Sequence, residues 1–174
     1  NNYNDILAEI TISKSLKKNI GTVIVKHGNP CGVSALKNNL DSYKSALKTD
    51  PISAFGGIVS CNYKVTQKIA LMLRKIFLEV IIANGFDKKA LKILKLKKNL
   101  RLIDSSKISF NDVWKSNSVG NFTLIQSEDK KIFSKNDFRI VSKRKPNRSQ
   151  IDNLIFAFNI CRYTKSNAIV LANN

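Results

Sequence analysis

Short apolar runs of strand length alternate with helical patterns along this chain, and that alternation constrains the fold more than any other feature. The run at 22–25 is β-branched and has no polar interruption, as expected of a strand that is buried on both faces. Similar strands are predicted at 57–61, 80–83 and 100–103, and helices at 5–18, 40–47, 65–77, 90–98 and 149–161. Strands that alternate with helices indicate an α/β fold.

The chain is less regular after residue 103. The stretch 104–120 has no clear period, whereas Phe122 and Leu124 alternate with polar neighbours in the manner of a half-exposed strand. Another strand is predicted at 139–142.

The clearest helix signal lies near the end of the chain. Ser149 and Asp152 have the spacing of a capping box, and an apolar stripe continues from there to Cys161. A last strand is predicted at 168–171. Because a buried strand needs neighbouring strands, we expect the chain to continue beyond Asn174.

The composition suits one domain of ordinary size, because 174 residues with 43% hydrophobic content can bury a substantial core. The net charge of +18 would suit a polyanionic partner, and a basic nucleic-acid-binding module is one alternative function. Lysines occur in nearly every segment, however, whereas a nucleic-acid surface concentrates charge on one face or helix. We therefore expect no nucleic-acid partner.

The cysteines and the apolar runs bear on the compartment. Cys31, Cys61 and Cys161 lie far apart, the first residues do not resemble a secretory signal, and no apolar run has membrane length. These features predict a protein of the reducing cytoplasm without a membrane partner.

A polar loop at 26–32, with the sequence Lys-His-Gly-Asn-Pro-Cys-Gly, directly follows the strand at 22–25. Ligands of open α/β sheets gather outside the carboxyl ends of strands, so this position is a mild indication of a site. His27 is the only histidine, and Lys26 and Asn29 add a cation and an amide to it, which favours a catalytic and substrate-binding loop. The structural alternatives are a histidine with only packing roles and a solvated lysine at a strand end.

Lys26 and His27 are neighbours, and neighbouring side chains of an extended segment point to opposite faces. Both can serve one site only if the chain bends between them. Gly28 and Gly32 would permit such a bend.

A zinc site is a weaker possibility, although His27 and Cys31 are four residues apart. Zinc deaminases need a glutamate beside the histidine and a second cysteine three residues after the first. Asn29 and Ser34 occupy those two positions. We therefore expect no catalytic metal.

Two other segments carry candidate residues. The turn at 50–57 ends in Phe55, Gly56 and a second glycine, which either allow close approach of a ligand or form a tight loop into the next strand. Glu79 has apolar neighbours and is either an exposed strand residue or a buried acceptor for an amide or amine. Asn167 either presents its amide to a substrate or caps the loop before the last strand.

Four segments complete the pattern: Val-Ile-Val-Lys-His-Gly-Asn-Pro-Cys-Gly at 23–32, Asp-Pro-Ile-Ser-Ala-Phe-Gly-Gly at 50–57, Glu-Val-Ile-Ile-Ala at 79–83 and Lys-Ser-Asn-Ala-Ile-Val at 165–170. In this order and spacing they resemble the formyltransferase region of the bifunctional purine biosynthesis enzymes, which formylate aminoimidazole carboxamide ribonucleotide (AICAR). The resemblance runs from residue 3 to residue 172.

The resemblance implies formyl transfer from 10-formyltetrahydrofolate, as cosubstrate, to the 5-amino group of AICAR. It places catalytic roles on Lys26, His27 and Asn167. His27 would remove the amine proton, Lys26 would stabilise the oxyanion or protonate the leaving folate nitrogen, and Asn167 would hold the formyl oxygen or orient His27.

Nucleotide contacts in the resembling enzymes correspond to Phe55, Gly56 and Glu79. Those enzymes form their active sites across a homodimer, use no catalytic metal, and carry an upstream IMP cyclohydrolase domain and a downstream glycine-rich segment. We therefore expect residues 1–174 to be a partial formyltransferase region that is inactive alone.

The resemblance also implies a pair of cytidine-deaminase-like α/β units without zinc, of which this chain would hold the first and the start of the second. Asn84, Ser127 and Asn173 depart from the usual residues of these enzymes at their positions. A catalytically dead deaminase-like scaffold is a further alternative.

Overall fold

The computed structural model describes residues 2–109, 114–127, 129 and 131–173. The chain divides into two compact units, each of which is described by itself. The first comprises Asn1–Ser106 and Ile160–Val170, and the second comprises Lys107–Asn159 and Leu171–Asn174.

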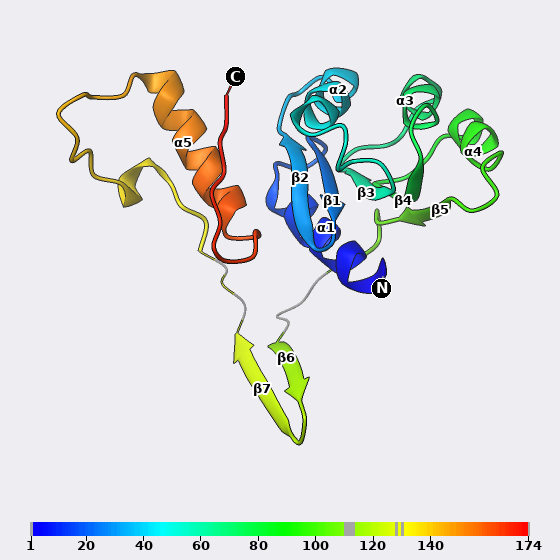
Figure 1. Ribbon diagram of the computed structural model, residues 1–174. Helices are drawn as coiled ribbons and strands as arrows, with labels where there is room; N and C mark the ends of the chain where they lie inside the picture. The colour runs from blue at the N-terminus through cyan, green and yellow to red at the C-terminus, as the bar shows by residue number, and fades with distance from the viewer. Residues whose placement is uncertain (1, 110–113, 128, 130, 174) are drawn as a thin grey trace. The chain divides into compact units, whose positions relative to one another are not determined.

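The first unit is built on a five-stranded sheet in the order β2-β1-β3-β4-β5 (Figure 1). The strands are β1 Thr22–Lys26, β2 Asn29–Ser34, β3 Gly57–Cys61, β4 Leu78–Ala83 and β5 Arg101–Asp104. β1 is antiparallel to both β2 and β3, whereas β3, β4 and β5 run parallel. The four predicted strands of this unit are confirmed, and the sheet is mixed.

Strand β2 is the element that the sequence failed to predict, because its Asn-Pro-Cys-Gly composition is typical of a loop. β2 is an edge strand of the sheet and has a neighbour, β1, on one side. An edge strand tolerates a proline such as Pro30, because no strand of the described structure lies on its other side to receive an N–H. Gly32 has a packing role in this strand. A Cβ at that position would overlap the backbone carbonyl of Ala46 in the helix that covers it.

Helices cover both faces of the sheet. They are α1 Asn2–Ser15, α2 Asn39–Thr49, α3 Gln67–Leu73 and α4 Lys88–Leu94, so α3 and α4 are shorter than predicted. Figure 1 shows α2, α3 and α4 on one side of the sheet and α1 on the other. Asn38 and Asp87 cap α2 and α4, because each side chain accepts hydrogen bonds from the first free N–H groups of its helix.

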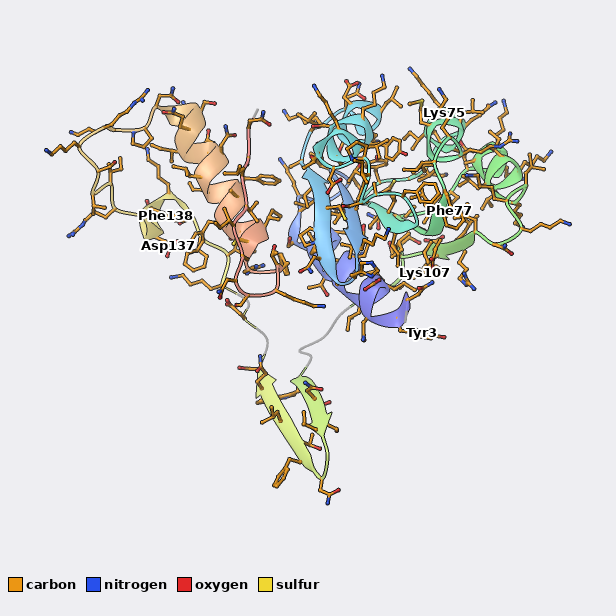
Figure 2. All side chains as sticks on the ribbon, in the orientation of Figure 1. Tyr3, Lys75, Phe77, Lys107, Asp137 and Phe138 are labelled. Atoms are coloured by element: carbon orange, nitrogen blue, oxygen red, sulfur yellow. The ribbon has the colours of Figure 1, made fainter. Side chains whose placement is uncertain are left out.

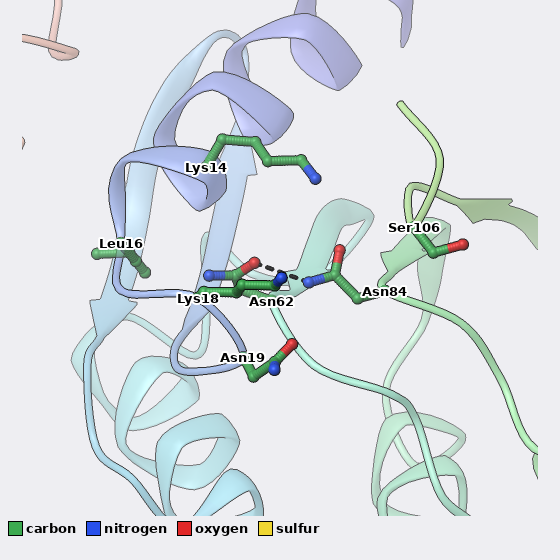
Figure 3. Close-up of a pocket in the computed structure, with 7 residues that line it drawn as sticks. All are labelled: Lys14, Leu16, Lys18, Asn19, Asn62, Asn84 and Ser106. Carbon is green, nitrogen blue, oxygen red and sulfur yellow. Dashed lines mark hydrogen bonds between the residues drawn. The ribbon is translucent and has the colours of Figure 1, made fainter. Parts of the chain in front are cut away.

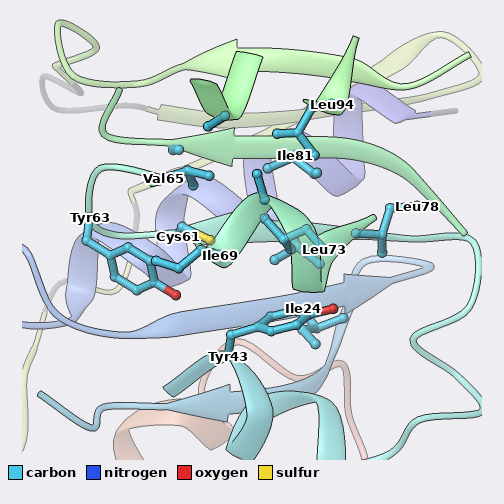
Figure 4. Packing of buried hydrophobic residues seen from close by; sticks show 14 of the residues in the cluster. Ile24, Tyr43, Cys61, Tyr63, Val65, Ile69, Leu73, Leu78, Ile81 and Leu94 are labelled. Atoms are coloured by element: carbon cyan, nitrogen blue, oxygen red, sulfur yellow. The ribbon is translucent and has the colours of Figure 1, made fainter. Parts of the chain in front are cut away.

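The core of the first unit lies between the sheet and helices α2, α3 and α4 (Figure 4). Ile24, Val59 and Ile81 come from three neighbouring strands and are fully buried. Tyr43 from α2 and Leu73 from α3 pack on them. The uninterrupted apolar strands are therefore explained by burial on both faces, since α1 covers the opposite side.

The second unit contains a hairpin of β6 Trp114–Val119 and β7 Phe122–Ser127, a short 3₁₀ helix at Lys135–Asp137 and helix α5 Arg148–Cys161, the last two residues of which belong to the first unit. β7 confirms the strand predicted near Phe122. Its partner β6 lies within the stretch that showed no periodicity. The sequence failed to predict β6 because its described side chains are exposed, as in the rest of the hairpin, and it has no alternation of apolar and polar residues.

Two predictions about the end of the chain are wrong. The described structure contains no strand at 139–142 or 168–171, since neither segment pairs with a neighbouring strand there. The start of α5 is also shifted. Asn147 and Gln150 exchange reciprocal side-chain to backbone hydrogen bonds of 2.9 Å, so they form the capping interaction that the sequence assigned two residues later.

Candidate active site

The predicted catalytic pair lies at a two-residue turn between β1 and β2. Lys26 pairs with Asn29 in the ladder, and His27 and Gly28 form the turn with φ angles of 54° and 70°. Two-residue hairpin turns require positive φ at such positions, which glycine adopts freely and histidine adopts more often than most residues. The chain therefore reverses directly after Lys26, and the His27 side chain is exposed.

The ammonium of Lys26 lies against the second glycine-rich segment. Its Nζ donates a hydrogen bond of 2.7 Å to the carbonyl oxygen of Phe55. This contact arises because β1 is antiparallel to β3, so the end of β1 lies beside the start of β3, where Val25 pairs with Ile58. Gly56 follows with a φ of 72°, and its N–H donates to the Phe77 carbonyl at 2.9 Å.

An exposed aromatic pair adjoins this contact. Phe55 and Phe77 are 58% and 47% exposed, and their ring centroids are 5.3 Å apart at a tilt of 45°. Phe77, which is labelled in Figure 2, directly precedes β4. The parallel pairing of Gly57 with Leu78 brings these two rings to the same edge of the sheet. Half-exposed aromatic faces beside a cation are suited to holding a flat polar ring.

Glu79 lies in β4 at the same edge and is half-buried. Its Oε2 accepts a hydrogen bond of 2.8 Å from the side-chain amide of Asn2 in α1. The carboxylate is therefore an acceptor for an amide within the structure, which is one of the two interpretations that the sequence left open.

The segment that carries Asn167 returns to the turn from the far end of the chain. The backbone N–H of Lys165 donates to Asn29 Oδ1 at 3.0 Å, and the Lys165 ammonium donates to the His27 carbonyl at 3.1 Å. Residues 160–170 belong to the same compact unit as the turn. Asn167 is exposed two residues beyond this contact.

The structure thus gathers most of the predicted site residues at one edge of the sheet, the edge at which β1 ends and β3 and β4 begin. Lys26, His27 and Asn29 share the turn, Phe55 is bonded to it, and Lys165 attaches the Ser-Asn segment. The sequence pointed to neither Lys165 nor Phe77. Lys165 was part of the last quoted segment, and Phe77 was detectable as an aromatic residue directly before a buried strand.

The candidate loop follows the carboxyl end of β1, as the sequence predicted. That end of β1 lies beside the amino ends of β3 and β4. The cause is the direction of β1, which is antiparallel to them and ends at their amino ends.

The opposite edge of the sheet contains a hollow of about 420 Å³ (Figure 3). It is lined by Lys14, Leu16, Lys18, Asn19, Asn62, Asn84 and Ser106. Asn84 Nδ2 donates to Asn62 Oδ1 at 2.9 Å, and Asn62 Nδ2 donates to the carbonyls of Lys17 and Ile20 at 3.0 Å. These amides connect the loop after α1 to the ends of β3 and β4.

Two of the cysteines, Cys31 and Cys61, have thiols that resist ionisation. Burial raises the pKa of Cys61 to about 12, and burial with the nearby carboxylate of Asp50 raises the pKa of Cys31 to about 11. Within the part of the chain that the structure describes, no three His, Cys, Asp or Glu side chains are grouped so as to hold a metal ion. No helix in that part is long and apolar enough to cross a bilayer.

Comparison with known proteins assigns the chain to a family. The family model described as AICARFT/IMPCHase bienzyme matches residues 1–174. The chain belongs to this family. Among curated relatives of the AICARFT/IMPCHase family, the bifunctional purine biosynthesis protein PurH of Caldicellulosiruptor saccharolyticus is 40% identical over 175 residues, which cover 99% of this chain and 34% of that protein.

Two further PurH proteins give the same result. That of Thermoanaerobacter sp. is 40% identical and covers 100% of this chain and 34% of its own length, and that of Prochlorococcus marinus is 43% identical and covers 90% and 31%. The chain therefore spans about a third of the family members it matches.

A solved structure of a dCMP deaminase from the cyanophage S-TIM5 resembles this chain at a TM-score of 0.42 and 12% identity, covering 58% of this chain and 94% of the deaminase. Likeness at this level does not assign the AICARFT/IMPCHase chain to a fold family.

Proposed function

We propose that the protein containing this chain transfers a formyl group from 10-formyltetrahydrofolate to the 5-amino group of AICAR, giving FAICAR and tetrahydrofolate. Family membership supports the reaction class. The observation that supports the site is the His27–Gly28 turn, at which the chain reverses directly after Lys26.

His27 acts as the general base. The AICAR amine is a poor nucleophile because its lone pair is delocalised toward the carboxamide, so its proton must leave as its nitrogen attacks the formyl carbon. Imidazole is the side chain suited to such a transfer near neutral pH. The exposed side chain of His27 at the tip of the turn is accessible to a bound nucleotide.

Lys26 stabilises the charge that develops on the formyl oxygen. An ammonium has three N–H donors, and one of them is held by the Phe55 carbonyl at 2.7 Å. That bond fixes the position of Nζ and leaves two donors for the tetrahedral oxyanion. When the intermediate collapses, the bond from carbon to the folate nitrogen breaks, and that nitrogen takes up the proton that His27 removed from the amine. Asn167 holds the formyl oxygen or orients His27.

The substrate-binding surface is the aromatic pair together with Glu79. The imidazole ring of AICAR stacks on Phe55, beside which Gly56 has no side chain to obstruct it. Glu79 already accepts from Asn2 through Oε2, so Oε1 is the atom available to a substrate amide or amine.

The wider proposal follows the family. We infer a homodimer with two deaminase-like units per formyltransferase half, an additional IMP cyclohydrolase activity, no catalytic metal and a cytoplasmic location. AICAR and the folate are the partners, and neither nucleic acid nor membrane is required. Nitrogen-tipped side chains surround α2, α3 and α4 instead of gathering on one helix, which agrees with a dispersed charge (Figure 2).

Formyl transfer by the full-length protein tests this proposal. The comparison uses the unmodified protein, His27→Ala, Lys26→Ala and, as a matched control, Lys48→Ala, whose exposed lysine lies in the last turn of α2. We expect the two site variants to lose activity while they keep the circular dichroism spectrum and melting temperature of the control. A folded but inactive unmodified protein would refute the function and favour a deaminase-like scaffold.

Salt-sensitive binding of RNA by that inactive protein would favour the basic nucleic-acid-binding module instead.

A further inference from the structure

We propose that Asn29 and Lys165 form a clasp that holds the Asn167 segment against the His27 turn, and that both are positioning residues for the reaction. The catalytic consequence of the clasp rests on the proposed function. Its structural basis is independent of that function, because two hydrogen bonds connect residues that are 136 and 138 positions apart in the chain.

The first bond attaches the backbone. Asn29 Oδ1 accepts from the Lys165 backbone N–H at 3.0 Å. Asn29 is held in turn by its place in the ladder opposite Lys26. The bond therefore fixes the main chain two residues before Asn167, whatever side chain stands at position 165. It also assigns Asn29, which the sequence assigned to substrate binding, to positioning, because its Oδ1 already accepts this bond.

The second bond attaches the turn. Lys165 Nζ donates to the His27 carbonyl at 3.1 Å, and a Cβ placed on Gly28 would lie 3.2 Å from the same Nζ. The ammonium therefore packs over the peptide that joins His27 to Gly28. A charge-assisted bond to that carbonyl stabilises a backbone conformation, φ 54°, that a non-glycine residue rarely adopts.

Charge supports this arrangement. The Lys165 ammonium adds a positive charge to a turn that already carries Lys26. Asp5 of α1 offsets it, because its Oδ1 lies 3.8 Å from the same hypothetical Cβ on Gly28 and so lies on the side of the turn where Nζ packs. The clasp therefore draws on three parts of the first unit: α1, the β1–β2 turn and the 160–170 segment.

The two bonds have different chemical requirements, which makes the clasp testable. Lys165→Met removes only the ammonium and keeps the side-chain length and the backbone bond. Lys165→Arg keeps a cation that reaches a carbonyl. Asn29→Ala removes only the backbone bond. Lys48→Met, an exposed lysine of α2, is the control for loss of one positive charge.

Hydrogen exchange of the full-length protein tests the clasp without reference to activity. In Lys165→Met and Asn29→Ala, we expect peptides covering 26–34 and 162–170 to exchange about tenfold faster, the effect of losing one bond to a positioned donor. Lys165→Arg and Lys48→Met should exchange like the unmodified protein. Unchanged exchange in both peptides of Asn29→Ala and Lys165→Met would overturn the clasp.

Kinetics then test the catalytic consequence. In Lys165→Met we expect kcat for formyl transfer to fall about tenfold with KM for AICAR unchanged, because the reacting groups and not the nucleotide lose their alignment. Lys165→Arg should restore kcat. In a His27→Ala background, Lys165→Met should cause no further loss.

The outcomes separate the two proposals. An inactive unmodified protein refutes the proposed function, and the clasp is then decided by exchange alone. An active protein whose Lys165→Met form keeps full kcat, or loses only affinity for AICAR, refutes the positioning role.

Discussion

Polar residues have different roles at the turn edge of the five-stranded sheet, where β1 ends, and at the opposite edge, where β3 and β4 end. At the turn edge, Lys26 and His27 keep hydrogen-bonding groups exposed, beside the half-exposed ring of Phe55. At the opposite edge, Asn62 and Asn84 bond to each other and to backbone carbonyls. We therefore expect polar residues at strand ends to indicate function where some of their hydrogen-bonding capacity is not consumed by the fold.

The largest effect should come from a matched pair of lysines at the two edges. Lys26→Met should lower kcat for formyl transfer by about 10² to 10³, as loss of one oxyanion donor does, whereas Lys14→Met should leave it unchanged. Lys14 is a fair partner, because its Nζ also donates to a backbone carbonyl, that of Ser105 at 3.3 Å. Steady-state kinetics with AICAR measure both. Equal losses would abolish the distinction between the edges.

Thiol reactivity gives the next effect, because each edge carries one cysteine. With a pKa of about 11 against an ordinary 9.0, Cys31 at the turn edge should react with iodoacetamide about a hundredfold more slowly than a free thiol at neutral pH. Cys61, at the end of β3, should be slower still, with a pKa of about 12. Mass spectrometry of labelled peptides measures both rates. Rapid labelling of Cys31 would reveal a thiolate at the turn.

The amides of the opposite edge should matter for stability and not for activity. Asn62→Ala removes an amide that bridges Lys17, Ile20 and Asn84, and should lower the free energy of unfolding by about 1–3 kcal/mol. Urea denaturation measures this, with the exposed Asn99→Ala as control. Formyl transfer by the folded variant should be normal. A loss of kcat without a loss of stability would show that this edge also contributes to catalysis.

The smallest effect should be a dependence of the free energy of unfolding on pH. It arises from a residue that lies between the two edges. Glu9 of α1 is buried under β3, where its Oε1 accepts from the Ser60 N–H at 2.6 Å, and burial raises its pKa well above the ordinary 4.5. Because the pKa of Glu9 is higher in the folded protein than in the unfolded chain, folding takes up a proton above pH 4.5. The stability that protonated Glu9 contributes is therefore complete below pH 4.5 and is lost as pH rises through the folded pKa.

Glu9→Gln should remove this dependence on pH while keeping the bond to Ser60. Urea denaturation of both proteins at a series of pH values measures the free energy of unfolding against pH. If the two proteins gave parallel curves, Glu9 would ionise in the folded protein without a loss of stability.

The sequence predicted four of the five strands of the first unit, because continuous burial leaves continuous apolar runs such as 22–25. It failed where exposure or polar composition conceals an element. β2 looked like a loop, and β6 had no apolar pattern. It also predicted a strand at 168–171, because apolar composition cannot show whether a pairing partner is present.

For the candidate site, the sequence selected residues by their chemistry. His27 was the only histidine, and Phe55 and Asn167 lay in segments that resemble a known family. It could not find Lys165 as a partner of the turn, since no local pattern encodes a contact across 138 positions.

What the sequence by itself determined is the set of buried apolar strands, the residue types of the candidate site and the glycines that allow the chain to bend, because these follow from side-chain chemistry and local backbone freedom. Only the tertiary structure decided that β1 is antiparallel to β3, and therefore that the candidate site residues of the two strands lie at the same edge. It also decided which amides are consumed by the fold and which lysine holds the turn. Strand direction and long-range hydrogen bonds depend on how distant segments pack, and that information is shared among residues far apart in the chain.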